Sequence, residues 1–254
     1  MNVVVLVKSV IDPNGQPRLG PDFLMDRSGD GTLDPGDEFA VEAALQLAAG
    51  SAGTVTAISM GPEGAAAAVR RALAMGADAG VLVTDPSLRG ADSLATARVL
   101  AAAVEQAGFD LVLAGVESAD GYTGTLPMAV AEFLDVPSAT FARKIEVTDG
   151  LARIERQTET GYDVIECPLP AVVTVTAGAT EPRYPTLKGI MASRSKPLER
   201  RTVADLGLDA AAVAPTQRVS GVTPAPAKSG GVVIEAGDDA VVRIADALDD
   251  AKVI

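Results

Sequence analysis

The stretch GVESADGYTGTL, residues 115–126, combines the residue types that bind a phosphate group. Its three glycines let the main chain approach a ligand, and its serine and threonines supply hydroxyl groups. Pro127 follows, and proline is favoured in the first turn of a helix, so the loop leads to a helix N-terminus whose amides and dipole attract anions. The loop therefore predicts a nucleotide phosphate site, with an ordinary connection rich in turn residues as the alternative.

Residue counts argue against most other kinds of reactive site. The 254 residues include no histidine and one cysteine, which excludes the usual zinc sites, Ser-His-Asp triads, Cys-His pairs and an internal disulfide. Cys167 is interpreted as a small buried hydrophobic residue. The chain has neither a GxxxxGK[ST] motif nor a GxGxxG after its first apolar run, so phosphoryl transfer from ATP is not supported. We expect a binding protein without catalytic residues or a metal site.

Charge and hydropathy limit the classes of partner that the protein could bind and the compartment in which it would occur. A net charge of −13 argues against nucleic acid and anionic membranes as partners. The apolar runs are too short to cross a bilayer, and Asn2 directly before a strand-like run leaves no room for a signal peptide. Together with the single cysteine, these features predict a cytoplasmic protein without membrane insertion.

Strand and helix patterns alternate through the first half of the chain. Short β-branched apolar runs (MNVVVLVKSV, TVTAISMG, AGVLVTD, DLVLAG) alternate with helical patterns over residues 37–50, 62–76 and 91–108 and from Pro127 onward. Such alternation predicts an α/β fold with a doubly wound, mostly parallel, Rossmann-like sheet. Ligands of doubly wound sheets bind beyond the carboxyl ends of the strands, where the 115–126 loop lies.

The pattern changes in the second half. Residues 143–156, RKIEVTDGLARIER, alternate with period two around Asp149 and Gly150, which predicts a β-hairpin insertion. PLPAVVTVTAG then predicts another buried strand. We expect a nucleotide-binding domain over residues 1–197 and an extended C-terminal arm over residues 198–254. The arm is either disordered or packed on a partner, and its many apolar residues favour packing.

One basic, proline-containing segment, residues 181–197 (EPRYPTLKGIMASRSKP), stands out in this acidic chain. Its prolines restrict the backbone, and Leu187, Ile190 and Met191 form one apolar patch if the segment is helical. Four basic residues would give this patch a rim that steers an acidic partner: Arg183, Lys188, Arg194 and Lys196. The alternative is a buried connection to the arm. We expect each interpretation to hold for part of the segment, with Leu187 exposed and Met191 buried.

The chain resembles the beta (small) subunit of electron transfer flavoproteins over nearly its whole length. The resemblance is carried by VLVKSVID, DPGDEFAVEAAL, SMGPEGA, DLVLAGVESADGYTG, FLDVP, LPAVVTV and, most specifically, EPRYPTLKGIM. It implies a heterodimer with an alpha subunit that holds the redox-active FAD, part of which the beta subunit shields. It also implies a structural AMP in the beta subunit, or a second FAD in electron-bifurcating members.

The resemblance implies specific nucleotide contacts. Pro13 stands where the family brings the beta subunit close to the flavin ring, and VESADGYTG differs from the common KQAIDGD type of loop. The contacts it implies for AMP are Leu6, Asp34, Pro35, Gly36, Asp37, Met60, Gly115, Val116, Glu117, Ser118, Ala119, Asp120, Gly121, Tyr122, Thr123, Gly124, Thr125 and Leu126.

The resemblance also gives the 181–197 segment a role, as the recognition loop whose leucine, here Leu187, enters an apolar pocket of a partner dehydrogenase. The partner-docking residues it implies are Arg183, Tyr184, Leu187, Lys188, Ile190 and Met191. The function it implies is electron transport from flavin dehydrogenases, such as the acyl-CoA dehydrogenases of fatty acid beta-oxidation, to a quinone oxidoreductase. An electron-bifurcating flavoprotein subunit and a stand-alone adenine-nucleotide sensor are the alternatives.

Overall fold

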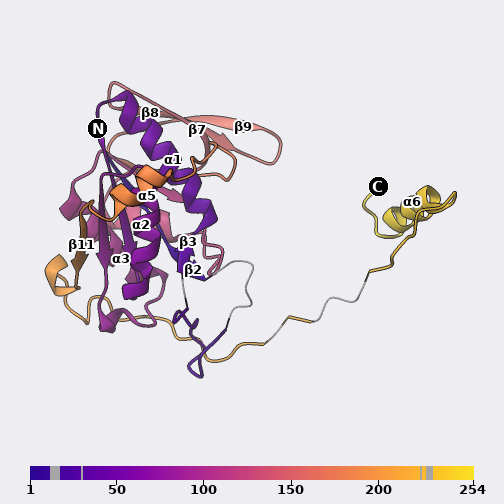
Figure 1. Cartoon of the computed structure of the whole chain (residues 1–254), viewed down its shortest axis with the longest axis horizontal. Helices are drawn as coiled ribbons and strands as arrows, with labels where there is room; N and C mark the ends of the chain where they lie inside the picture. Colours follow the sequence, from indigo (N-terminus) through magenta and orange to yellow (C-terminus); the bar gives the residue numbers. More distant parts are fainter. Residues whose placement is uncertain (12–17, 30, 224, 227–230) are drawn as a thin grey trace. The chain divides into compact units, whose positions relative to one another are not determined.

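The computed structural model describes residues 1–11, 18–29, 31–223, 225–226 and 231–254 (Figure 1). The described chain forms two units, Met1–Ser220 and Gly221–Ile254. We expected the division at residue 197, but Leu198–Arg201 joins the sheet, and Val203, Leu206 and Val213 are buried in the core. These contacts place the residues up to Ser220 in the first unit.

The first unit contains all the strands found in the described residues. They are β1 (Asn2–Leu6), β2 (Ser9–Ile11), β3 (Gly31–Leu33), β4 (Thr54–Met60), β5 (Ala79–Val83), β6 (Leu111–Gly115), β7 (Ser138–Thr148), β8 (Leu151–Gln157), β9 (Tyr162–Pro168), β10 (Ala171–Val175) and β11 (Leu198–Arg201). Its α-helices are α1 (Pro35–Gly50), α2 (Ala66–Met75), α3 (Ser93–Ala107), α4 (Leu126–Phe133) and α5 (Leu187–Ser193). Short 3-10 turns occur at Glu63–Ala65, Pro86–Leu88 and Ala204–Leu206.

Within the described residues, nine strands form one sheet in the order β11-β5-β4-β1-β6-β10-β7-β8-β9. The strands from β11 to β7 are parallel, and β8 and β9 continue the sheet in antiparallel pairing. Helices α1, α2, α3 and α4 supply crossovers between parallel strands, whereas β7 and β10 are connected through β8 and β9. The predicted α/β, doubly wound, mostly parallel sheet is confirmed.

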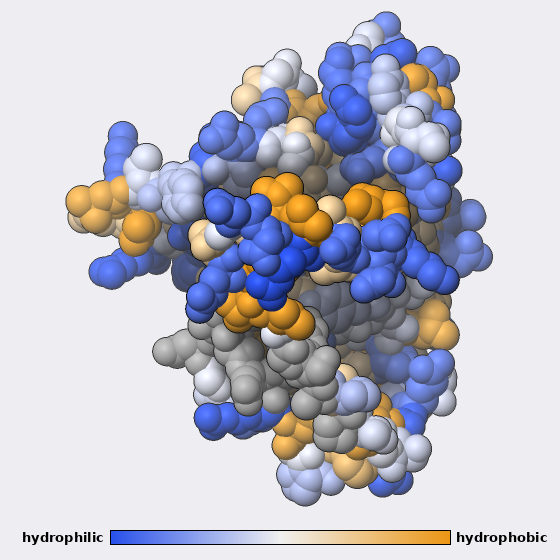
Figure 2. All heavy atoms as spheres, turned by 90° about the vertical axis from the view of Figure 1, so that its right-hand side faces the viewer, coloured by the Kyte–Doolittle hydropathy of each residue, from blue (hydrophilic) through white to orange (hydrophobic). Residues whose placement is uncertain are grey.

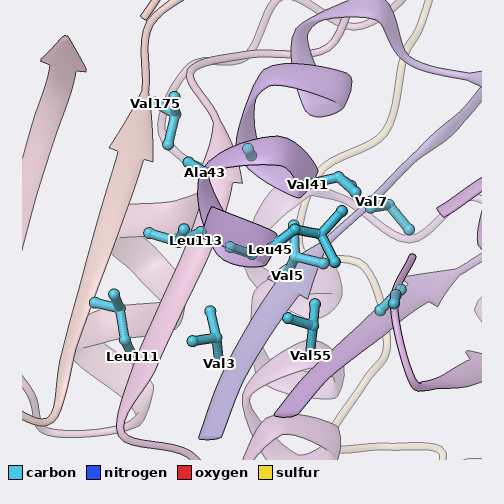
Figure 3. Packing of buried hydrophobic residues seen from close by; sticks show 14 of the residues in the cluster. Val3, Val5, Val7, Val41, Ala43, Leu45, Val55, Leu111, Leu113 and Val175 are labelled. Carbon is cyan, nitrogen blue, oxygen red and sulfur yellow. The ribbon is translucent and has the colours of Figure 1, made fainter. Parts of the chain in front are cut away.

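Two apolar layers cover the two faces of the sheet. Successive residues of β1 alternate between them, because neighbouring side chains of a strand point to opposite faces. Val3 and Val5 belong to the layer that contains buried residues of α1 and α2, and Val4 and Leu6 to the layer that contains those of α3 and α4. Figure 3 shows the first layer, with valines and leucines of β1, β4 and β6 beneath α1. Parallel strands buried on both faces account for their continuous apolar runs.

The predicted hairpin is present. β7 and β8 pair around Asp149 and Gly150, whose φ angles of 51° and 77° are those of a tight two-residue turn. Strand β9 extends this hairpin on the far side of β8. Cys167 on β9 is buried in the core, and burial raises the pKa of its thiol. This confirms its interpretation as a hydrophobic core residue.

The second unit contains α6 (Ala240–Asp250), none of whose described side chains is buried. Val241, Val242, Ile244 and Leu248 leave between 38% and 77% of their surface exposed. Figure 2 draws one face of the chain, on which hydrophilic residues predominate around separate apolar patches. None of the helices among the described residues is long and apolar enough to cross a membrane.

Candidate functional site

The carboxyl ends of β1, β4 and β6 lie at one edge of the sheet. β1 pairs with β4 on one side and with β6 on the other, so the order of the strands reverses there. Such a topological switch point is where doubly wound sheets bind ligands. The last residues of the three strands are Leu6, Met60 and Gly115, all predicted as nucleotide contacts.

A buried carboxylate at this edge joins the start of α1 to the 115–126 loop. Asp34 is 1% exposed and caps the N-terminus of α1, where its side chain accepts the N–H of Gly36 at 2.8 Å. Its other carboxylate oxygen accepts the N–H of Ala119 at 2.7 Å. One side chain therefore holds the loop after β6 against the helix after β3.

A second buried carboxylate, Asp37, joins β1 to β6. It accepts the main-chain N–H of Lys8 at 2.7 Å and that of Gly115 at 3.2 Å. Burial, reinforced by the neighbouring Asp34, raises the pKa of Asp37 to about 8, and the two N–H donors only partly oppose this. Gly115 has no room for a side chain, because a Cβ there would lie 2.6 Å from an Asp37 oxygen.

These contacts change which groups remain for a ligand. Four amides at the edge already donate to the side chains of Asp34 and Asp37, and Asp34 caps the N-terminus of α1. The close approach at Gly115 is consequently to α1, whereas the sequence suggested an approach to a ligand. α4 offers a different N-terminus, since the Thr125 side chain makes no capping hydrogen bond within the described chain.

A cationic cluster that the sequence analysis missed faces the same loop. Lys8 Nζ lies 2.5 Å from Asp120 Oδ1 and donates to Ser118 Oγ at 2.9 Å. Arg27 lies 2.7 Å from the other Asp120 oxygen and also donates to the Ser9 carbonyl. Burial alone would raise the pKa of Asp120, but Lys8 and Arg27 outweigh it and lower this pKa. The cluster carries one net positive charge in an acidic chain.

Three of the predicted contacts share an apolar floor. Leu6 is a buried member of the layer that contains α3 and α4, and Met60 and Leu126 pack against that layer. The rest of the predicted loop, Val116–Leu126, is half-buried or exposed. Tyr122 is 70% exposed, with a φ of 47°. Pro13 lies outside the described residues. An apolar floor suits the base of a nucleotide, and cations and hydroxyl groups beside it suit the phosphate.

Residues 181–197, the predicted recognition loop and hereafter the recognition segment, present an apolar surface. Tyr184, Leu187, Ile190 and Met191 are 87%, 75%, 43% and 66% exposed. The expectation that Met191 is buried is therefore wrong. The segment turns a different face inward, because Ser193 of α5 is the buried residue while Ile190 and Met191 point elsewhere on the helix.

The four basic residues of this segment do not form a uniform rim. Arg183 pairs with Glu42, a 4% exposed residue of α1, through contacts of 2.7 and 2.9 Å. The ammonium group of Lys196 contacts main-chain carbonyls at the end of α2. Lys188 and Arg194 are exposed. The positive charge that faces solvent is thus smaller than the sequence suggested.

The structure defines a doubly wound α/β protein, with polar and charged side chains gathered at the switch point of its sheet and a separate apolar segment on its surface. Residues 22–206 match the model of the electron transfer flavoprotein domain. The chain is 41% identical to electron transfer flavoprotein subunit beta of Mycobacterium tuberculosis, with 91% of each chain covered. It is 36% identical to the subunit of that name from Thermoanaerobacterium thermosaccharolyticum, with 100% of each covered.

A further relative is the caffeyl-CoA reductase-Etf complex subunit CarD of Acetobacterium woodii, which is 37% identical with 92% of each chain covered. The chain belongs to the electron transfer flavoprotein family, among its beta subunits. Its role accordingly lies in electron transport.

Proposed function

We propose that this chain pairs with an alpha subunit, shields the FAD held mainly by that subunit, and binds AMP as a structural element. The observation that carries the nucleotide site is the convergence at the switch point of the apolar floor, the loop hydroxyls and the Lys8–Arg27 cations. The adenine would lie on the floor formed by Leu6, Met60 and Leu126. The phosphate would face the loop and the N-terminus of α4.

FAD supplies the redox chemistry when it is bound to the alpha subunit. The residues of this chain hold and orient, and none of them is assigned an acid or base role. Asp34 and Asp37 fix the main chain around the nucleotide, while Lys8 and Arg27 hold the loop through Asp120. The recognition segment brings the partner's flavin close to that of the complex.

The partners proposed are flavin dehydrogenases such as acyl-CoA dehydrogenases as electron donors and a quinone oxidoreductase as acceptor, in the cytoplasm. Leu187 and its exposed apolar neighbours would enter a pocket of the dehydrogenase. The unit Gly221–Ile254 would pack on the alpha subunit, since the exposed valines, isoleucine and leucine of α6 need a partner.

A second candidate is the beta subunit of an electron-bifurcating flavoprotein, with FAD in place of AMP. The observation that favours it is the similarity to a subunit of a caffeyl-CoA reductase-Etf complex. FAD contains an adenylate half, so the same floor, hydroxyls and cations fit either nucleotide. Membership in this family gives no support to the alternative of a stand-alone nucleotide sensor.

The relay is tested with the complex of this chain and its alpha subunit. An acyl-CoA dehydrogenase is reduced with its acyl-CoA substrate without oxygen, and the flavin absorbance of the added complex is followed. We expect the flavin to be reduced at a rate that saturates with complex concentration. A mixture without the dehydrogenase serves as the control. A flavin that stays oxidised beside the reduced dehydrogenase would contradict the proposal for this class of donor.

A further inference from the structure

Helix α5 of the recognition segment is too short to be stable without contacts to the rest of the chain. It spans only Leu187–Ser193, and a helix of two turns is not stable alone in water. Leu187, Ile190 and Met191 are exposed and contribute little burial that would hold it. The conformation of the proposed docking surface must therefore be imposed by the contacts of α5 with the rest of the chain.

Those contacts are made with α2, against which α5 packs (Figure 1). The two backbones touch at Gly189, where a Cβ would lie 2.5 Å from the carbonyl oxygen of Ala74. Any larger residue at this position would push α5 away from the last turn of α2. The backbone of α5 thus packs directly against α2, while the apolar side chains on its other face are exposed.

Two cations then fasten the ends of the two helices to each other. Lys196, just beyond α5, donates from Nζ to the carbonyls of Leu73, Gly76 and Ala77 at 3.1, 3.2 and 2.6 Å. These are carbonyls at the C-terminal end of α2, where the helix dipole favours a positive charge. An ammonium group has three donors, and all three find an acceptor there.

The reciprocal contact comes from α2. The guanidinium group of Arg70 donates to the carbonyl of Ser193, the last residue of α5, and to that of Lys196 at 2.9 Å. Each helix therefore has its C-terminal carbonyls satisfied by a cation carried on or beside the other. At the opposite end of the segment, the pair between Arg183 and the buried Glu42 fixes the chain that enters α5.

We propose that Lys196 and Arg70 are positioning residues, which hold α5 on α2 so that its apolar face is presented to the partner dehydrogenase already ordered. The effect on dehydrogenase docking rests on the proposed function. The contacts that hold α5 on α2 do not depend on it. Lys196 then acts inward, as a clamp, and not as a charge that steers an acidic partner. Ordering the segment before docking reduces the conformational entropy lost in the complex.

The test compares Lys196→Met with Lys188→Met in the complex with the alpha subunit. Both variants remove one lysine charge from the same segment, but only the first removes the clamp. Hydrogen exchange of the peptide over residues 187–196 should become about ten- to hundredfold faster in Lys196→Met and stay unchanged in Lys188→Met. Lys196→Arg, which keeps a cation near the carbonyls, should recover part of the protection.

Electron transfer from an acyl-CoA dehydrogenase gives the second readout. For Lys196→Met, the KM for the complex should rise with little change in kcat, and the effect should persist at high salt. Equal, salt-sensitive losses in both lysine variants would assign Lys196 to steering and overturn the clamp. If Lys196→Met does not fold, Arg70→Met tests the reciprocal half of the clamp, the contacts with the carbonyls of Ser193 and Lys196. Unchanged exchange in Arg70→Met would then overturn the proposal. Failure of electron transfer in the unmodified complex would contradict the proposed function, and the exchange data would still decide on the clamp.

Discussion

Asp37→Ala is expected to lower the free energy of unfolding by about 2–6 kcal/mol, because each of the two buried N–H groups left without an acceptor costs about 1–3 kcal/mol. The groups are those of Lys8, just after β1, and of Gly115, the last residue of the neighbouring strand β6. Loss of the carboxylate frees the ends of β1 and β6 from each other. The complex should also retain less nucleotide after gel filtration.

The thermal unfolding midpoint of the complex, compared at one protein concentration, measures this effect. For a chain of this size the midpoint should fall by roughly 5–15 °C. Asp110→Ala is the matched control, because Asp110 also accepts a main-chain N–H, that of Asn2 at 2.7 Å, but at an exposed position where water can replace it. Equal midpoints for the two variants would contradict the role assigned to Asp37.

The same residue predicts a pH dependence. The pKa of Asp37 is raised from 3.8 to about 8, so the folded chain keeps this proton to a higher pH than the unfolded chain does. The stability gained from that difference is complete below pH 3.8 and is lost as the pH rises through about 8. Asp37→Asn has no proton to lose. Its midpoint, measured relative to the unmodified complex, should therefore rise between about pH 5 and about pH 9. A constant difference would show that Asp37 does not titrate in this range.

Leu187→Ala is expected to lower kcat/KM for electron transfer from an acyl-CoA dehydrogenase by about ten- to hundredfold, because a fully buried leucine contributes about 1.5–3 kcal/mol to an interface. Leu187 is 75% exposed in this chain, so the substitution removes little internal packing. The unfolding midpoint should remain within about 2 °C of the unmodified complex. The loss should appear mainly in KM.

Val164→Ala is the control for this variant. Val164 is 47% exposed on β9, a strand at the opposite end of the sheet from β11, and its truncation also removes exposed apolar surface. It should leave electron transfer unchanged. If Leu187→Ala behaves like Val164→Ala, the apolar face of α5 is not where the dehydrogenase docks.

The alternation of apolar strands and helices was sufficient to predict the parallel sheet, and Asp149-Gly150 was sufficient for the hairpin, because both signals are local. The sheet extends past residue 197, where the sequence placed the start of the arm, for a physical reason. β11 is an edge strand with the sequence Leu-Glu-Arg-Arg, whose charged side chains face solvent, so it lacks an apolar run. Its pairing with β5 depends on a strand more than a hundred residues earlier, which no local pattern reveals.

The position of the 115–126 loop at the carboxyl edge of the sheet was predicted from the sequence, but the hydrogen bonds and ion pairs that hold it there were not. The glycines and hydroxyls of the 115–126 loop indicated the edge, and Asp34 and Asp37 came from the family resemblance. Lys8 carried one weak signal, as a charge directly after a buried strand, and Arg27 carried none. Both reach Asp120 only through the folded chain. The same holds for Met191, since the face that α5 turns inward is set by Gly189 against α2.

We propose above that this chain holds a structural AMP at the switch point of its sheet beside the FAD of an alpha subunit. The most direct test of this proposal is to denature the purified heterodimer, separate the released nucleotides by chromatography and count them per complex. We expect one FAD and one AMP per heterodimer. Two FAD and no AMP would replace the AMP claim with the electron-bifurcating alternative, and a single FAD with no second nucleotide would contradict the site at the switch point altogether.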